Sequence, residues 1–165
     1  MKIIGIDPGL SGAIAVLDNS KIEEIFNMPV MADGKKNKRQ LNSAQLVKLI
    51  KGFIEKGEET IVAVEQVNAM PGQGVTSMFN FGQTFGAIKG ICAALGLSIF
   101  FVRPAKWKKH FELINSSKDA SRTKAIEMYP SFSHQLSKKK DVNKSDAILI
   151  ARFYSETRIT DNIKY

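Results

Sequence analysis

The chain has 165 residues, which is enough for one domain with a hydrophobic core of its own. Apolar residues make up 44% of it, a share that is typical of globular proteins and excludes a disordered chain. Lys and Arg number 24 against 16 Asp and Glu, and the net charge of +8 favours a phosphate-rich partner such as nucleic acid.

The beginning of the chain predicts a small antiparallel sheet. Three apolar runs separated by turn residues predict strands, at residues 2–7, 13–17 and 22–28. Because the intervening turns are short, we expect neighbouring strands to pair antiparallel. Residues 31–40 are polar and carry four cations between Lys35 and Arg39, which predicts a mobile basic loop.

The remainder of the chain alternates helices with two further strands. Apolar residues at the helical period predict a helix that is capped by Asn42 or Ser43 and stopped by Gly57. The further strands are expected at residues 60–65 and 97–102. The further helices are expected at residues 75–95, from Pro104, at 120–129 and at 145–155. This order predicts one α/β domain over residues 1–165, with a mixed five-stranded sheet, three antiparallel strands and then two more, flanked by helices.

The cellular location follows from cysteine content and hydropathy. The single cysteine, Cys92, excludes an internal disulfide and a zinc site built from several cysteines. The sequence contains no apolar run of bilayer length, and residues 1–7 reach an acidic residue without the apolar stretch of a secretory signal. We therefore expect a cytoplasmic protein with no membrane partner.

Three acids stand where secondary-structure elements end or begin. Asp7 and Glu65 end predicted strands, and Asp146 lies at the start of the last helix. Taken singly, these acids could begin a turn, end an edge strand and cap a helix. If they converge at one edge of the sheet, they would form a site for Mg²⁺, which binds few protein carboxylates and completes its shell with water and phosphate oxygens. Two such ions can hold the attacking and leaving oxygens of a phosphodiester in line.

Three segments resemble the motifs of the RuvC-like Holliday junction resolvases, which belong to the ribonuclease H-like superfamily. The segment at residues 4–12, Ile-Gly-Ile-Asp-Pro-Gly-Leu-Ser-Gly, resembles their first motif. Residues 62–67, Val-Ala-Val-Glu-Gln-Val, resemble the second, and residues 144–151, Lys-Ser-Asp-Ala-Ile-Leu-Ile-Ala, resemble the last. The segments at 70–82 and 104–109 look like the branch found in phages and related viral or organellar proteins.

This resemblance implies a fold, a chemistry and an assembly. It implies a ribonuclease H-like fold in which Asp7, Glu65 and Asp146 are catalytic and hold Mg²⁺ or Mn²⁺, with two ions in each active site. It also implies a homodimer that makes paired nicks across a four-way DNA junction. The expected location is the cytoplasm of a bacterial cell, or that of the host if the protein belongs to a phage or virus.

The chain departs from the cellular members of that family at two positions. They carry a fourth acid three residues before the last one, where this sequence has Asn143. Asp141 can replace it only if residues 141–144 are non-helical, whereas the Asn143 amide can ligate if the helix begins early. We predict Asp141 as the fourth catalytic metal ligand, against the alternative that it pairs with a lysine at the surface.

The second departure concerns an aromatic residue that wedges into the junction. The cellular proteins carry it three residues after the second-motif glutamate, where this sequence has Asn68. A wedge would therefore have to come from another residue, for which Met70 and Phe79 are candidates.

Lysines gather in two further places. We predict that both groups bind the DNA backbone, although such runs are often only solvated. The predicted DNA-binding residues are Lys106, Lys108 and Lys109 beside Trp107, and Lys138, Lys139 and Lys140 just before the last motif. Trp107 could stack on a base or pack in the core or in a dimer contact. Gly82, Gly86 and Gly90 line one helix face and predict close approach of either the sheet or a second copy of the helix.

Two other functions compete with the nuclease. Sugar kinases and actin-like ATPases open with a similar acid and glycine turn, but they need a later glycine-rich phosphate motif that this sequence does not contain. A non-catalytic binder of branched DNA or RNA with the same fold stays open, because Asn143 replaces an acid.

Overall fold

The fold is described from a computed structural model, which covers residues 1–34, 36–54 and 57–161, with side chains described as far as residue 158. Its main sheet has five strands in the order β3-β2-β1-β6-β7. These strands are β1 (Lys2–Asp7), β2 (Ala13–Asp18), β3 (Lys21–Asn27), β6 (Thr60–Glu65) and β7 (Ser98–Val102). The first three pair antiparallel, and β6 and β7 continue the sheet parallel to β1. The predicted mixed sheet is therefore confirmed.

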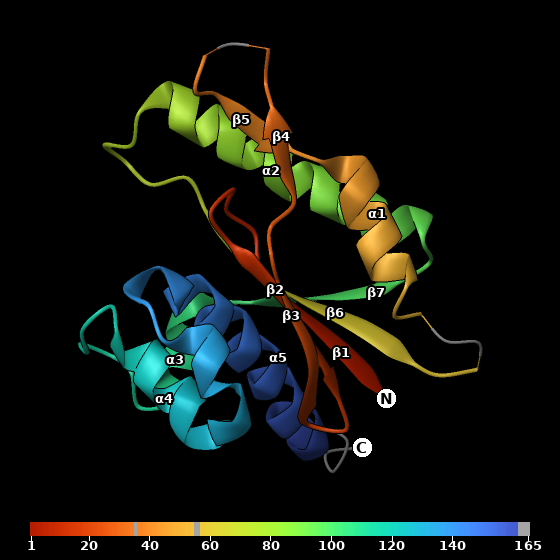
Figure 1. The fold of residues 1–165 in the computed structure, drawn as a ribbon, viewed down its shortest axis with the longest axis vertical. Coiled ribbons are helices and arrows are strands. Elements are labelled where there is room, and N and C mark those ends of the chain that lie inside the picture. The colour runs from red at the N-terminus through yellow and green to blue at the C-terminus, as the bar shows by residue number, and fades with distance from the viewer. Residues whose placement is uncertain (35, 55–56, 162–165) are drawn as a thin grey trace.

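Helices cover both faces of this sheet (Figure 1). One face carries α3 (Pro104–His110), α4 (Ala120–Met128) and α5 (Val142–Asp161). The other carries α1 (Ser43–Lys51) and α2 (Val75–Ala94). The short 3-10 helices η1 (Pro130–Leu136) and η2 (Lys139–Asp141) connect α4 to α5. None of the helices in the described part of the chain is long and apolar enough to cross a membrane.

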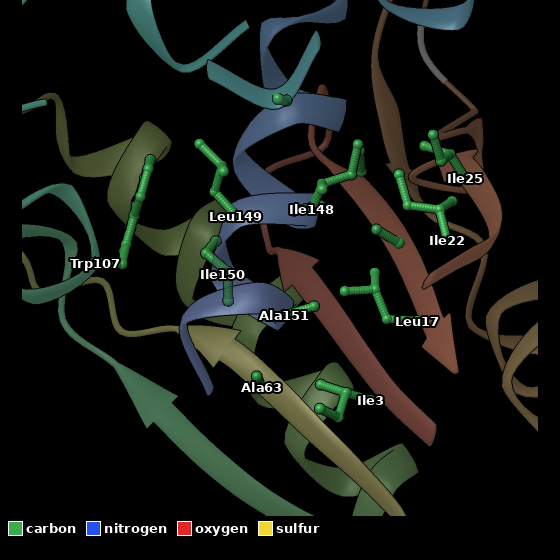
Figure 2. Packing of buried hydrophobic residues seen from close by; sticks show 14 of the residues in the cluster. Ile3, Leu17, Ile22, Ile25, Ala63, Trp107, Ile148, Leu149, Ile150 and Ala151 are labelled. Atoms are coloured by element: carbon green, nitrogen blue, oxygen red, sulfur yellow. The ribbon is translucent and has the colours of Figure 1, made fainter. Parts of the chain in front are cut away.

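The alternation of side chains along the strands divides the interior into two cores. Ile3, Leu17 and Ala63 pack beneath α5, together with Trp107 of α3 (Figure 2). The intervening strand residues, such as Ile4 and Val62, pack against α1 and α2. Because successive strand residues point to opposite faces, the odd-numbered residues of β1 and β6 all face α5.

Small residues allow α5 to lie directly on the sheet. A Cβ atom added at Gly5 would collide with the carbonyl oxygen of Ala147 and lie 2.8 Å from the Cβ atom of Ala151. Only glycine fits at this point of β1, and the close approach fixes the depth of α5 over the strand ends.

Two boundaries differ from the sequence-based expectation in the first half of the chain. The segment expected to be a mobile loop contains a two-stranded ribbon of β4 (Val30–Ala32) and β5 (Arg39–Leu41), although Lys35 lies outside the described residues. Strands this short pair through their backbones and carry too few side chains to show a period. Helix α1 begins after the Asn42 cap, as predicted, but it ends at Lys51 and not at Gly57.

The predicted start of the last helix is wrong. Helix α5 begins at Val142 and not at Ser145, and η2 leads directly into it. The Asp141 carboxylate accepts a hydrogen bond of 2.9 Å from the backbone nitrogen of Lys138, so it caps this turn and allows the helix to begin early.

Candidate active site

Three carboxylates from distant parts of the chain meet at one edge of the sheet. Asp7 and Glu65 end adjacent parallel strands, and the pairing of Ile6 with Val64 places these two acids side by side. Both are at odd-numbered positions, so both face α5. Asp146 lies in the second turn of α5, which packs on β1 and therefore brings this carboxylate to the same edge.

Burial and mutual proximity raise the pKa values of the three acids. Burial raises the pKa of Asp7 to about 7, and the charges of Glu65 and Asp146 add to the shift. Burial likewise raises the pKa of Asp146 to about 6, with a further contribution from Glu65, and burial also raises the pKa of Glu65. The charge of Lys108 acts on all three acids in the opposite direction. The site thus concentrates negative charge that a bound cation would stabilise.

Each carboxylate has a hydrogen-bond donor from a different element. The backbone nitrogen of Gly9 is 3.4 Å from Asp7 Oδ1, and the Ser121 hydroxyl is a partner of Asp146. The Trp107 indole nitrogen donates to Glu65 Oε1 over 2.9 Å. This role of Trp107 was not predicted, because nothing local to residue 107 indicates a partner in another strand.

The three carboxylates are ligands of the kind that a hard divalent cation prefers, although they are too far apart in this structure to hold one ion together. Asp146 Oδ1 is buried and has no hydrogen-bond partner within the described residues, as expected of an oxygen that a cation would use. Among the same residues, no three His, Cys, Asp or Glu side chains lie close enough together to hold one ion. Asp7, Glu65 and Asp146 would therefore have to draw closer around a metal.

Asp141 does not meet the condition set for it as the fourth ligand. Asp141 could reach the site only if the residues after it were non-helical, but residues 142–144 are helical. Its carboxylate caps η2 and lies 3.3 Å from the ammonium group of Lys144. Although burial opposes the change, the hydrogen bond from Lys138 and the charge of Lys144 lower the pKa of Asp141. The Asp141 carboxylate thus has its hydrogen-bond and ion-pair partners within its own segment.

Asn143 lies beside Asp146. The two residues are three apart on α5, so they share a face, and they line one cavity together with Trp107 and Lys108. The amide nitrogen of Asn143 donates to the Ser11 carbonyl oxygen over 2.6 Å, which ties α5 to the loop after Asp7.

The predicted DNA-binding lysines occupy two exposed regions, and Lys108 is the one whose charge acts on the three carboxylates. One region is α3, which exposes Lys106, Lys108 and Lys109. The other is the segment just before α5, where the lysines at positions 138–140 are exposed. Lys118 was missed by the sequence analysis, and it lines the same cavity as Asp146.

The glycine stripe of α2 faces away from the sheet. Cβ atoms added at Gly82, Gly86 and Gly90 would meet no heavy atom within 4 Å in the described structure, so the prediction of close approach to the sheet is wrong. Val75 and Phe79, which continue this stripe at helical spacing, are 84% and 65% exposed. The remaining alternative is that this face of α2 contacts α2 of a second copy of the chain.

No protein-family model and no curated protein matches the sequence. Solved structures do resemble the fold. A Thermus thermophilus RuvC in complex with a Holliday junction substrate has a TM-score of 0.60 at 14% identity, covering 95% of this chain and 96% of that one. Another T. thermophilus RuvC structure has a TM-score of 0.56 at 16% identity, covering 96% and 97% of the two chains. The chain therefore has the ribonuclease H-like α/β fold of RuvC.

Proposed function

We propose that this chain is a metal-dependent endonuclease of a single RuvC-like domain that cuts branched DNA, with the four-way junction as its substrate. The observation that carries the proposal is the meeting of Asp7, Glu65 and Asp146 at one sheet edge, each with a raised pKa. The fold supports it, because one RuvC of this fold was solved with a Holliday junction substrate.

The chain's own residues have distinct roles in the proposed reaction. Asp7, Glu65 and Asp146 would hold Mg²⁺ or Mn²⁺, and two bound ions would supply the charge that stabilises in-line displacement at phosphorus. Lys108, whose charge already acts on all three acids, would bind a phosphate oxygen of the cleaved strand. The lysines at 138–140 would bind the DNA backbone further along the duplex.

The direct test is cleavage of synthetic four-way, flap and linear DNA with and without Mg²⁺. We expect paired nicks in the four-way substrate that require the metal. Tight binding without cleavage, in both Mg²⁺ and Mn²⁺, would instead support a non-catalytic binder of branched DNA.

The fourth ligand can be tested by substitution. Because Asn143 shares the cavity with Asp146, Asn143→Ala should lower Mg²⁺-dependent cleavage at least about tenfold, equivalent to about 1.4 kcal/mol. Asn143→Asp loses the hydrogen bond to Ser11, as Asn143→Ala does, but it adds a charged ligand, so it should cut at a lower Mg²⁺ concentration than Asn143→Ala. Asp141→Asn, the matched control, should cut at nearly the parental rate. A loss confined to Asp141→Asn would restore that residue as the ligand.

Binding should depend steeply on salt and on the lysines before α5. Replacing Lys138 and Lys140 by Ala should reduce the slope of log affinity against log salt by about 2, as expected for two lost phosphate contacts. The control is Lys48→Ala with Lys51→Ala on α1, which covers the opposite face of the sheet and should leave the slope unchanged. Equal slopes for the two double variants, measured by fluorescence anisotropy, would remove residues 138–140 from the interface.

The protein should be a homodimer, because symmetric cutting of two strands requires two sites related by a two-fold axis. We propose the exposed stripe of α2 as the contact. Gly86→Arg should then give monomers in sedimentation equilibrium without unfolding, since no heavy atom of the described residues lies within 4 Å of its added Cβ. Asn80→Arg, exposed on another side of α2, should remain dimeric. A dimer that persists in Gly86→Arg would exclude this face.

A further inference from the structure

Trp107 is a buried side chain whose polar atom is directed at the proposed metal site. It is 0% exposed and packs in the core beneath α5, with Leu149 and Ile150 close by (Figure 2). A buried indole nitrogen needs an acceptor, and here the acceptor is Glu65 Oε1 at 2.9 Å. Trp107 thus links α3 to the end of β6 through one carboxylate oxygen.

The hydrogen bond takes one lone pair of Glu65 Oε1, so Oε2 is the carboxylate oxygen that stays fully available to a cation. The indole is rigid and fully packed, so it holds the carboxylate in one orientation, and its N–H group competes with a cation for Oε1. The Lys108 ammonium group lies 5.4 Å from the centroid of the Trp107 ring, and its charge also acts on Glu65.

The two common divalent cations differ in how they use a carboxylate. Ca²⁺ takes about six to eight oxygens in flexible geometry and readily accepts both oxygens of one carboxylate. Mg²⁺ requires a near-ideal octahedron of about six ligands, and it usually keeps several waters and takes few carboxylate oxygens. A glutamate restricted to one oxygen therefore suits Mg²⁺ or Mn²⁺ and penalises Ca²⁺.

We propose that Trp107 is a positioning residue that restricts Glu65 to single-oxygen coordination and so favours Mg²⁺ or Mn²⁺ over Ca²⁺. This inference rests on the proposed function, because it concerns the same metal site. It assigns Trp107 a role that packing alone does not require, since a phenylalanine would fill most of the same volume.

The test compares cation binding by the intact protein and by Trp107→Phe, which keeps an aromatic ring but has no N–H group. Isothermal titration calorimetry with Mg²⁺ and with Ca²⁺ gives the two dissociation constants without relying on cleavage. We expect the ratio of the Ca²⁺ constant to the Mg²⁺ constant to fall at least about tenfold in Trp107→Phe, the lower end of the effects on metal affinity of removing a hydrogen-bond partner from a metal ligand. Phe111→Leu, a buried neighbour in the same core, is the matched control for lost packing and should keep the parental ratio.

The outcomes separate this inference from the proposed function. An unchanged ratio in a folded Trp107→Phe protein would overturn the role of Trp107 and leave the nuclease assignment intact. Absence of any Mg²⁺ or Mn²⁺ binding by the parent protein would overturn the metal site itself, and the inference with it. Equal changes in Trp107→Phe and Phe111→Leu would assign the effect to packing and also overturn the inference.

A second measurement does not use the Trp107→Phe variant. Trp107 is the only tryptophan in the chain, so the intrinsic fluorescence of the parent reports on its indole alone. Mg²⁺ should change this emission in a saturable way, and Glu65→Gln, which keeps an acceptor but loses the charge, should abolish the change. If the emission does not change at Mg²⁺ concentrations where calorimetry detects binding, the link between Trp107 and the metal site is contradicted.

Discussion

Asp7→Asn should abolish Mg²⁺-dependent cleavage while leaving junction binding intact, and it should stabilise the metal-free protein above pH 7. The loss of cleavage follows from the neutral amide, which is a poor ligand for a hard cation. The gain in stability follows from the raised pKa of Asp7, which moves from 3.8 to about 7 on folding because of burial and the charges of Glu65 and Asp146.

The pH window of this effect follows from proton linkage. Below about pH 4 the Asp7 carboxyl is protonated in both the folded and the unfolded chain, so it has no effect on stability. Between about pH 4 and 7 the folded chain keeps a proton that the unfolded chain has lost, so stability falls as the pH rises. Above pH 7 the full cost of the buried charge remains, at most about 4 kcal/mol by the conversion of 1.36 kcal/mol per pKa unit.

Thermal unfolding in EDTA at pH 5 and pH 8, with gel shifts and cleavage assays, would measure these effects. The stabilisation by Asp7→Asn should be larger at pH 8, and added Mg²⁺ should raise the melting temperature of the parent but not of the variant. Asp33→Asn, at an exposed acid outside the site, should show neither effect. Cleavage by Asp7→Asn at the parental rate would contradict the assignment of the site.

Gly5→Ala should destabilise the fold by about 3 kcal/mol or more, the upper end for overpacking of a core. The added methyl would collide with the Ala147 carbonyl oxygen and the Cβ atom of Ala151, and neither backbone can move without lifting α5 from β1. Because Asp146 lies on α5, the same displacement would separate it from Asp7 and weaken metal binding.

Chemical denaturation gives the unfolding free energies needed for this comparison. Gly74→Ala is the control, because Gly74 has a backbone conformation open to alanine and its added Cβ meets no heavy atom within 4 Å in the described structure. We expect a clearly larger loss of unfolding free energy for Gly5→Ala than for Gly74→Ala. A Gly5→Ala protein that unfolds at the parental denaturant concentration would show that α5 does not depend on this contact.

Local features of the sequence were sufficient to predict the framework and the candidate acids. The strands that end at Asp7 and Glu65 are apolar runs bounded by turn residues, and both properties depend only on neighbours in the chain. Given these strands, the pleat and the parallel pairing place both acids on one face at one edge. The long helix α2 was likewise evident from its length and its flanking glycines.

Tertiary packing decided the features that the sequence analysis missed or assigned wrongly. The early start of α5 follows the 3-10 turn η2, which leads directly into the helix, and the ribbon of β4 and β5 depends on backbone pairing between strands of three residues. The outward direction of the Gly86 face depends on which side of α2 meets the sheet.

The hydrogen bond from the Trp107 indole to the Glu65 carboxylate joins residues that are 42 positions apart, so no local sequence pattern could indicate it. The sequence by itself determined the elements and the carboxylates available for chemistry, because periodicity and turn chemistry act over a few residues. Only the folded chain decided which groups orient those carboxylates, because such contacts depend on how distant elements pack against one another.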